Sequence, residues 1–322
     1  MNMDHILNAN LFKVWSKFVM ASVIGVVLNT IYTIIDGMFV GQGVGEIGLA
    51  AVNIVWPAIT LIIGTGLMLG IGASSLIAIS LGKKDIEEAE KYLGTTMVAS
   101  IAIGALITIV GLLFRNPILR MLGADEMVMP YAQDYFSIFY CITIPYIFST
   151  ALNPIVRTDG NPKLAMMMVG IGAIANIILD YLLVIVFDFG IKGAAIATSA
   201  SIVLSTLISL YYFLKGNSAI KIRKLYLKLD GKILKEIVKI GFVSFMIQLS
   251  YGTIIFVQNN VMYAYGSNID VAIYTVASYV NCFFVNVCTG ISQGLQPLIG
   301  YHFGANKWTR MKQFLYLSIV IS

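Results

Sequence analysis

The feature that most constrains this chain is a series of long apolar segments separated by short polar loops. A bilayer core needs about 20 apolar residues per helix, and eight segments reach that length. Hydrophobic residues make up 58% of the sequence and charged residues 11%, whereas a soluble domain carries about 25% charged residues. The sequence therefore predicts an all-α, polytopic membrane helical bundle. The expected spans are residues 18–40, 53–80, 92–114, 131–153, 164–187, 193–214, 240–264 and 271–300.

A ninth apolar segment begins near residue 313 and continues to Ser322, the last residue of the sequence. No closing charges or polar tail follow it. We therefore expect the sequence to be a fragment of a longer protein.

The lysines and arginines indicate the orientation. If the N-terminal side is inside, 18 of the 21 basic residues fall in inside segments, and only Arg115, Arg120 and Lys192 fall in outside loops. Cytoplasmic loops carry such an excess of Lys and Arg. Because the bias alternates correctly across every loop, we expect a multi-pass protein with its N-terminus in the cytoplasm.

The longest polar stretch, residues 216–241, lies between the sixth and seventh expected spans. Its lysines and arginines could form a patch for anionic lipids or nucleic acid. The positive-inside rule explains the same charge without a partner, so we interpret the stretch as a cytoplasmic linker and expect no nucleic-acid partner. Asp230 and Gly231, followed by apolar residues, predict a short interfacial helix that leads into the seventh span.

An internal repeat relates two parts of the chain. The second span ends in ASSLIAISLGKKDIEEAEKYL and the eighth in LQPLIGYHFGANKWTRMKQFL. Each has an apolar helix that closes on glycine, a short charged loop and an amphipathic restart, and Gly82 matches Gly304 at an offset of 222 in the numbering. We therefore expect an N-terminal six-helix lobe at 1–214, a linker at 215–239, and the start of a pseudo-symmetric second lobe at 240–322. A complete second copy would make twelve helices.

Polar residues inside the spans indicate a site. Asp36 lies in the first span, in the stretch NTIYTIIDGMFVG, where an ionised carboxylate costs at least about 3 kcal/mol. The fifth span contains Asn176 and Asp180 at a spacing of four residues, which places both on one helix face. The sixth span carries Thr198 among small residues that allow close helix approach.

Depth in the bilayer favours one shared site. At 1.5 Å per residue, Asp36 lies about 27 Å and Asp180 about 24 Å from the inner ends of their helices. Thr198 lies about 8 Å below the outer end of its own helix. Solvation at the membrane interface could explain either acid alone, but the agreement in depth favours a common polar site in the outer leaflet.

The chemistry of these groups suits a small cation. Two carboxylates in a poorly hydrated pocket repel each other unless they share a proton or a cation. The pair therefore suits reversible binding of H⁺, and with the oxygens of Asn176 and Thr198 it could coordinate Na⁺. The offset of 222 carries Asp36 onto Gln258, so we expect ion coupling to be concentrated in the N-terminal lobe.

Other polar residues could line a substrate cavity. Tyr32 lies one turn before the first acid, and Asn153 precedes Pro154, which should kink the fourth span. Gln248 and Gln258 lie in the seventh span. Hydrogen bonds between helices explain such residues equally well. The sequence contains no ATP-binding motif, zinc set or Ser/His/Asp arrangement, so we expect a protein that is not an enzyme and needs no cofactor beyond its coupling ion.

Three stretches resemble the multidrug and toxic compound extrusion (MATE) family: DGMFVGQGVGEIGLAAVNIVWP, SLGKKDIEEAEKYL and RTDGNPKLAM. They occur in the family's order, and the resemblance covers the whole chain. It implies twelve helices in two six-helix lobes around a central cavity, and exchange of H⁺ or Na⁺ for organic, often cationic compounds. The short loops look most similar to MepA-like exporters and the DNA-damage-inducible type of bacterial members.

By motif position, the resemblance also implies roles for individual residues. A family tyrosine one turn before the first aspartate matches Tyr32, and a fourth-helix asparagine matches Asn153. A sister group uses a glutamate in the seventh helix, and this chain has none there. The residues that match the family's cation site are Asp36, Asn176, Asp180 and Thr198.

Residues and resemblance together predict a cation-coupled antiporter that exports hydrophobic, often cationic drugs. We expect a monomer in the lipid bilayer of a bacterial cytoplasmic membrane. One alternative is a lipid-linked oligosaccharide flippase of the same superfamily, which would favour an Arg-lined cavity, whereas basic residues avoid the expected spans. The other is a non-transporting membrane protein or channel.

Overall fold

The computed structural model describes the backbone of residues 3–265 and 268–321, and side chains except those of residues 1–5, 255–256, 258–260 and 262–283. Within these ranges every regular element is a helix, as predicted. Six of the described helices are long and apolar enough to span a membrane, and one bent pair makes a seventh. The elements are α1 (Met3–Asn8), α2 (Leu11–Gly43), α3 (Glu46–Gly82), α4 (Ile86–Leu113), α5 (Arg115–Met121), α6 (Met129–Cys141), α7 (Thr143–Thr158), α8 (Pro162–Asp180), the π-helix η1 (Tyr181–Val186), α9 (Gly190–Lys215), the 3₁₀-helix η2 (Lys224–Tyr226), α10 (Gly231–Tyr265), α11 (Asn268–Gly304) and α12 (Trp308–Ile321).

Each predicted span coincides with one helix or with a pair of consecutive helices, and the ninth begins at Trp308 instead of near residue 313. The predicted interfacial helix before the seventh span is not a separate element. Its residues form the first turns of α10, where Asp230 Oδ1 accepts hydrogen bonds from the N–H groups of Lys232 (2.9 Å) and Ile233 (3.2 Å). This aspartate caps the start of α10, at the position where the sequence predicted the interfacial helix to begin.

The fourth predicted span is broken near Ile142, where the axes of α6 and α7 differ by 59°. Pro145 has no N–H to donate to the carbonyl one turn earlier. The carbonyl four residues before Pro145 is that of Cys141. The neighbouring carbonyl of Tyr140 accepts from the hydroxyls of Thr108 and Thr143 at 3.0 and 2.9 Å, so it is satisfied inside the bundle at the break. The kink was predicted at Pro154, but α7 continues through Pro154 to its end.

The helix bounds repeat with the offset of 222 found in the sequence. Both ends of α3 match the two ends of α11 at this offset. The end of α2 matches the end of α10 in the same way, and the start of α4 matches the start of α12. The connecting loops match in conformation too, because Lys84 (φ 66°) and Asn306 (φ 56°) both adopt the left-handed region. Two copies of one helical unit therefore build this part of the chain.

Equivalent positions of the two copies meet where α3 packs against α11. Gln296 Nε2 donates to Ser74 Oγ at 2.8 Å, and these two positions are related by the same offset of 222. Four residues further along, a side chain on Gly300 would overlap the methyl group of Ala78. A contact between equivalent residues is the mark of a twofold relation, so this contact lies at the local twofold axis.

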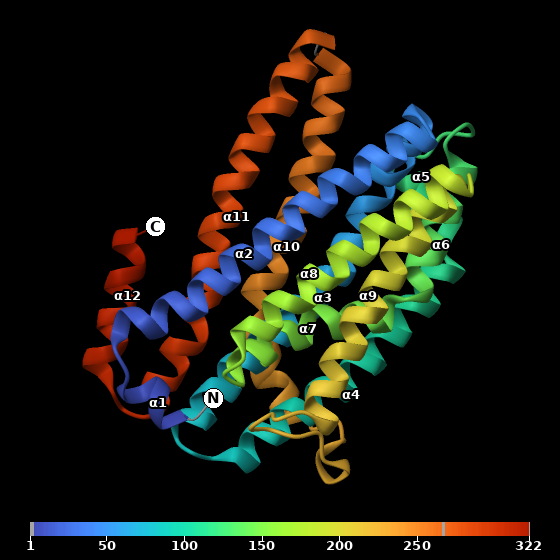
Figure 1. The fold of residues 1–322 in the computed structure, drawn as a ribbon. Coiled ribbons are helices and arrows are strands. Elements are labelled where there is room, and N and C mark those ends of the chain that lie inside the picture. The colour runs from blue at the N-terminus through green and yellow to red at the C-terminus, as the bar shows by residue number, and fades with distance from the viewer. Residues whose placement is uncertain (1–2, 266–267, 322) are drawn as a thin grey trace.

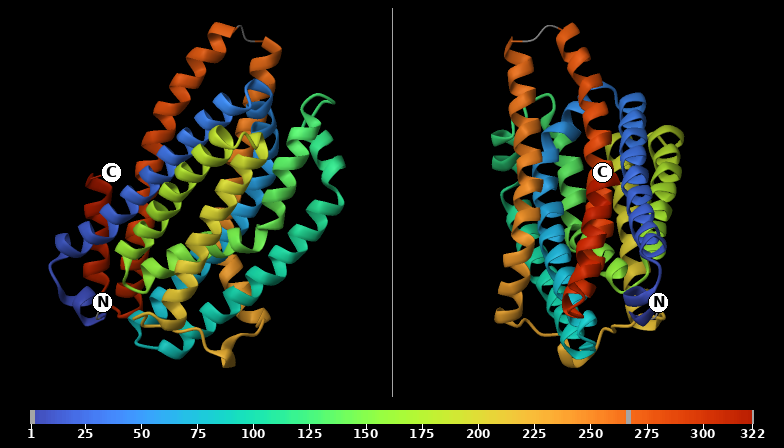
Figure 2. Two further views of the ribbon diagram at one scale, coloured as in Figure 1. Left: turned by 45° about the vertical axis from the view of Figure 1, so that its right-hand side comes forward. Right: turned by 90° about the vertical axis from the view of Figure 1, so that its left-hand side faces the viewer.

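Figure 1 shows the arrangement that results, with α3 in the interior against α4, α6, α7, α10 and α11. The helix α2 packs along α8 on one side and α11 on the other. Figure 2 shows α10 and α11 as long antiparallel helices that diverge from one end, and each of them packs against α3. At one end of the bundle Trp15 Nε1 donates to Ser318 Oγ at 2.8 Å and ties α2 to α12.

Candidate functional site

Three helices bring the predicted polar residues together. Asn176 Nδ2 on α8 donates to Thr198 Oγ1 on α9 at 3.2 Å, and Thr198 Oγ1 donates a long hydrogen bond of 3.4 Å to Asp36 Oδ1 on α2. Figure 1 shows α2, α8 and α9 as neighbours, and each pair of these helices is in contact. The hydroxyl of Thr198 thus connects the first acid to the asparagine.

Asp180 completes this group from the last position of α8. Its side chain is fully buried, and its carboxyl group lies close enough to Asp36 for direct interaction. Among the residues that the structure describes, no donor makes a hydrogen bond of ordinary length and angle to either carboxylate oxygen of Asp180 or to Oδ1 of Asn176. A buried acceptor without a donor costs about 1–3 kcal/mol, and more if it is charged.

Local sequence explains how these side chains reach one layer. After Asp180 the helix widens into η1, whose last turn closes with a hydrogen bond from the Phe187 N–H to the Leu182 carbonyl at 2.8 Å. Single π-turns inside α-helices occur often at functional sites. On α9, the fully buried Ala194, Ala195 and Ala197 keep side-chain volume low, so that the helix approaches its neighbours closely.

An apolar cluster lies one turn further toward the predicted outer side. It consists of Val40, Val184 and Ala194, which are all buried and pack together. Each lies four residues from Asp36, Asp180 or Thr198 respectively, in the direction of the outer helix end. The cluster separates the acids from the outer end of their helices and keeps the local environment poorly hydrated, so a charge between the acids interacts strongly with them.

Three tyrosines lie within electrostatic range of the acids. Tyr32 interacts electrostatically with Asp36 and Asp180, and Tyr135 on α6 and Tyr146 on α7 lie within range of Asp36 as well. Only Tyr32 was a sequence candidate. Nothing in the sequence marked Tyr135 and Tyr146 as site residues. The bend between α6 and α7 decides which of the many aromatic side chains on these two helices face inward.

The remaining candidates lie elsewhere. Asn153 Nδ2 donates to the Ala165 carbonyl (2.9 Å), and its Oδ1 accepts from Arg157 (3.1 Å). Gln248 lies beside Gly64 at the contact of α10 with α3, and the side chain of Gln258 lies outside the described residues. None of these three has a described contact with the acids, so their predicted part in a substrate cavity stays a prediction.

The buried Arg157 was missed at the sequence level. Its side chain is 6% exposed, and it donates from α7 to the backbone carbonyl (3.2 Å) and side-chain oxygen (3.3 Å) of Gln293 on α11. It lies in the last turn of α7, next to the loop that leads to α8. Its hydrogen bonds join α7 to α11 at that end of the bundle.

The donor set of the site consists of hard oxygen atoms. Two carboxylates, one amide oxygen and one hydroxyl suit a proton or a hard cation such as Na⁺ better than a transition metal. No group of three or more His, Cys, Asp or Glu side chains that could hold a metal ion occurs in the described part of the chain. The oxygens of Asp180 and Asn176 that receive no donor are the atoms that a bound cation would satisfy.

Comparison with known proteins agrees with this architecture. The family described as MatE matches residues 21–182 and 240–322. The multidrug export protein MepA of Staphylococcus aureus strain MSSA476 is 29% identical over 306 residues, which are 94% of this chain and 67% of that protein. A crystal structure of MATE in complex with MaD3S superposes with a TM-score of 0.92 at 27% identity, covering 100% of this chain and 72% of that one. The outward-facing conformation of a multidrug resistance MATE family transporter gives a TM-score of 0.91 at 27% identity, with 100% and 71% of the two chains covered.

Proposed function

Because this chain belongs to the MatE family of membrane transporters, we propose that it is a cation-coupled antiporter that exports hydrophobic, often cationic drugs. The family couples transport to an ion, and the relatives named MepA are multidrug export proteins. The observation that carries the proposal is the pair of neighbouring acids, the half-buried Asp36 and the fully buried Asp180, together with the oxygens of Asp180 and Asn176 that have no hydrogen-bond partner among the described residues.

The pair works as a site for the driving ion, H⁺ or Na⁺. Two acids this close in a poorly hydrated layer repel each other, and a proton or cation between them removes the repulsion. Thr198 and Asn176 hold the geometry, since their hydrogen bonds connect α9 and α8 to Asp36. For Na⁺, the carboxylates and the oxygens of Asn176 and Thr198 would be the ligands.

Ion binding is coupled to drug release through α2. This helix carries Asp36 at the site and packs along both α8 and α11. Drawing the acids together changes the packing of α2 against α8, which lowers the affinity for the drug and releases it outward. The ion can drive this change only through its different affinity for the two arrangements. A rocking movement of the two copies then reloads the transporter from the inside.

The repeat supports the proposed division of the chain. Residues 1–214 form the N-terminal lobe, residues 215–239 a cytoplasmic linker, and residues 240–322 the beginning of a second lobe. The basic residues place the N-terminus in the cytoplasm. The protein acts as a monomer in the cytoplasmic membrane of a bacterium.

Efflux from vesicles tests the proposal. The protein is reconstituted and a cationic dye is followed under an imposed pH gradient or an imposed sodium gradient, one at a time. We expect one gradient to drive dye movement, and Asp36→Asn and Asp180→Asn each to abolish the driven part. The matched control is Asp134→Asn, because Asp134 is half-exposed and pairs with Lys192 at 3.4 Å, away from the site.

Two results would contradict the proposal. If neither gradient moved the dye, the assignment as an ion-coupled exporter would be wrong. If both site variants kept the full driven rate, the transporter would remain but its ion site would lie elsewhere.

A further inference from the structure

A buried arginine connects α7 with α11 at the end of the bundle that the basic residues place in the cytoplasm. Arg157 is 6% exposed, and its Nη1 donates to the backbone carbonyl (3.2 Å) and side-chain oxygen (3.3 Å) of Gln293. Its Nη2 donates to Asn153 Oδ1 at 3.1 Å. Among the described residues no acidic side chain forms an ion pair with Arg157. The guanidinium is therefore held by neutral oxygens alone, which offset only part of the cost of removing its charge from water.

A second polar contact lies three residues further along α11. Gln296 Nε2 donates to the hydroxyl oxygens of Ser74 and Ser75, both at 2.8 Å, and to the Ile71 carbonyl at 3.3 Å. Residues three apart lie on the same side of a helix. Gln293 and Gln296 therefore turn one side of α11 toward α7 and α3, which both belong to the proposed N-terminal lobe.

The last turns of α3 and α11 leave no space between them. A side chain on Gly82 would overlap the carbonyl of Tyr301, and a side chain on Gly304 would overlap the carbonyl of Ile79. The side chain of Tyr301 is fully buried. The two backbones are thus in direct contact, and no drug-sized molecule fits between α3 and α11 at this end.

The helix that carries Asp36 reaches the same region. A side chain on Gly294, the residue after Gln293, would overlap the backbone of Val19 on α2. The helices α2, α3 and α7 therefore all meet α11 within a few residues of Gln293. Separation of the lobes at this end has to break the hydrogen bonds of Arg157 along with these close helix contacts.

We propose that Arg157 sets how readily the lobes separate at their inner end, because its charge favours the separated arrangement and the oxygens of Gln293 favour the closed one. This inference rests on the rocking movement of the proposed function. When the lobes separate, water reaches the guanidinium and replaces Gln293, so the charge regains its hydration. When they close, hydrogen bonds from a charged donor hold the contact. Arg157 has no described contact with Asp36 or Asp180, so it is a positioning residue for the movement and not an ion ligand.

A simple tie between the lobes is the competing role for the same hydrogen bonds. A tie would be weakened alike by loss of Arg157 or of Gln293. A buried charge predicts opposite effects of the two losses. Removing the acceptor leaves a charge without its partner in the interior, which is strongly unfavourable, whereas replacing the charge with an apolar side chain is often neutral or stabilising.

Thiol labelling tests the proposal without a drug or an ion gradient. The full chain, in a background without its three cysteines, carries Ser74→Cys. Ser74 is fully buried at the contact with Gln296, so a thiol there is protected until the lobes separate. The protein in phosphatidylcholine nanodiscs is treated with a water-soluble maleimide. Where separation and closure are faster than the reaction, the labelling rate follows the fraction of separated molecules.

The variants should shift this rate in opposite directions. Gln293→Leu should label at least about tenfold faster than the parent, a difference of about 1.4 kcal/mol. Arg157→Lys should also label faster, because lysine keeps the charge but lacks the planar fork of donors. Arg157→Met should label more slowly than the parent, and adding Gln293→Leu to it should change little. Unfolding can only speed labelling, so misfolding cannot produce the expected decrease.

Matched controls lie away from the contact. Gln133 on α6 donates to Asn116 Oδ1 at 2.9 Å, and the side chain of Arg120 is 72% exposed. Gln133→Leu and Arg120→Met repeat the two chemical changes at these positions and should leave the labelling of Ser74→Cys unchanged.

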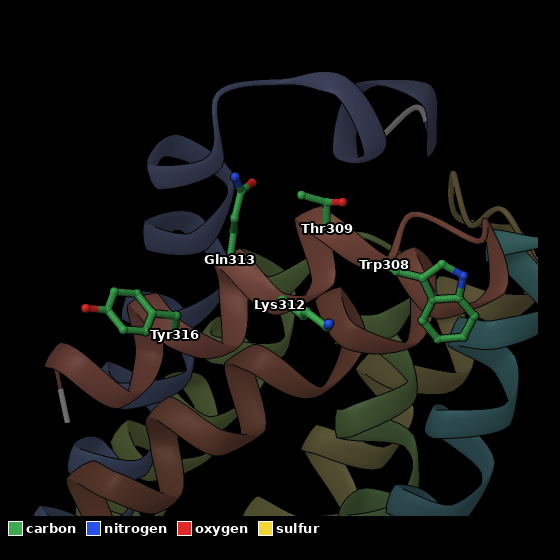
Figure 3. Close-up of a pocket in the computed structure, with 5 residues that line it drawn as sticks. All are labelled: Trp308, Thr309, Lys312, Gln313 and Tyr316. Atoms are coloured by element: carbon green, nitrogen blue, oxygen red, sulfur yellow. The ribbon is translucent and has the colours of Figure 1, made fainter.

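An exposed cysteine calibrates the reagent. Thr309→Cys is placed on α12, at an open depression of about 490 Å³ that Trp308, Lys312, Gln313 and Tyr316 also line. Figure 3 shows the side chain of Thr309 on the surface of this helix. Its labelling rate should be the same in every variant.

Two outcomes would overturn the proposal. If the Gln293 and Arg157 variants all labelled at the parent rate, neither residue would affect the separation. If Arg157→Met labelled as fast as the parent or faster, the charge would not favour the separated arrangement.

Dye efflux on the same variants keeps this inference apart from the proposed function. If labelling shifted as expected while neither gradient moved the dye, the assignment as an ion-coupled exporter would be wrong and the role of Arg157 would stand. If the dye moved and the labelling did not shift, the exporter would stand and the role of Arg157 would be wrong.

Discussion

The two copies of the repeated unit share their backbone but differ in their chemistry. α3 and α11 agree in both bounds at the offset of 222, yet the position of Asp36 on α2 is Gln258 on α10. A helix needs only an apolar surface and small residues at its crossings. A cation site also needs partners from neighbouring helices, as Asn176, Asp180 and Thr198 supply here.

A second difference lies at the other end of the molecule. Residues 219–228, which we call the strap, lie against the start of α4, where Glu90 pairs with Arg223 at 2.6 Å, whereas the equivalent position on α12 is Lys312. In both comparisons the two copies have the same backbone arrangement, and a few different side chains change what each copy binds. Four experiments can break or sharpen this comparison, and they are ordered from the largest expected effect to the smallest.

Moving the acid between the copies should abolish coupling. We expect Asp36→Gln to lower gradient-driven efflux by at least about fivefold and up to about 150-fold, the usual range of a coupling free energy. Adding Gln258→Asp should not restore it, because the partners of Asp36 come from α8 and α9. Vesicle efflux measures both, and Asp134→Asn, which affects the pair with Lys192, should behave like the unaltered protein. Recovery in the double variant would show that either copy can couple.

Filling the close contact between the copies should destabilise the protein. A side chain on Gly300 would overlap Ala78, and such overpacking costs about 1–3 kcal/mol. We therefore expect Gly300→Ala to lower the melting temperature in detergent micelles. Gly37, also within a helix, has no neighbour within 4 Å, so Gly37→Ala should be neutral or slightly stabilising. Equal effects of the two changes would mean that the contact does not hold the copies together.

Asp159, outside the membrane-spanning helices, should make the strap sensitive to pH. It is 1% exposed and accepts from the Tyr212 hydroxyl (2.6 Å) and from the N–H groups of Ala219 (3.0 Å) and Ile220 (3.0 Å). Burial raises its pKa from 3.8 to about 6, against the opposing effect of these hydrogen bonds.

The sign of the pH effect follows from that direction. Between about pH 4 and pH 6 the folded protein holds a proton on Asp159 that the unfolded chain has lost. The contribution of this group to stability is therefore full below pH 4 and is lost as the pH rises through about 6, by at most about 3 kcal/mol. We expect Asp159→Asn to flatten the melting temperature between pH 4.5 and 7. An unchanged slope would exclude Asp159 as its source.

Matched substitutions on α4 and α12 should have unequal effects. Glu90→Gln breaks the pair with Arg223, whose side chain is 61% exposed, so we expect a cost of about 1 kcal/mol. Lys312→Gln removes an exposed charge and should change stability by less than about 0.5 kcal/mol. Thermal melts in micelles check both, and a loss at Lys312 as large as that at Glu90 would show that Lys312 already has a partner within this chain.

Much of the fold could be predicted from the sequence because membrane helices follow directly from apolar length. The six membrane-capable helices, the bent pair among the described residues and the offset of 222 needed only hydropathy and two glycines. The acids were visible because a carboxylate in an apolar segment is costly, and their depth followed from the helical rise. Thr198 was found through its depth and its small neighbours.

Other features could not be predicted because they depend on packing. The fourth span breaks near Ile142 instead of at Pro154, since hydroxyls from two helices satisfy the exposed carbonyl there. Asn153 faces Arg157, and Tyr135 and Tyr146 approach Asp36, because the bend sets the direction of α6 and α7. The apolar cluster of Val40, Val184 and Ala194 combines three helices, and each of its members is ordinary in its own segment.

The amino-acid sequence by itself determined which segments enter the membrane and which family the chain resembles. It also determined that two acids lie in apolar segments, where an ionised carboxylate needs a partner. These conclusions depend on the free energy of moving each side chain from water into hydrocarbon. That free energy is a property of the residue type and does not depend on the fold. Only the tertiary structure decided that α8 and α9 deliver Asn176, Asp180 and Thr198 to Asp36, and that the strap lies on α4. Those outcomes depend on helix crossings and on short-range contacts, which no single segment contains.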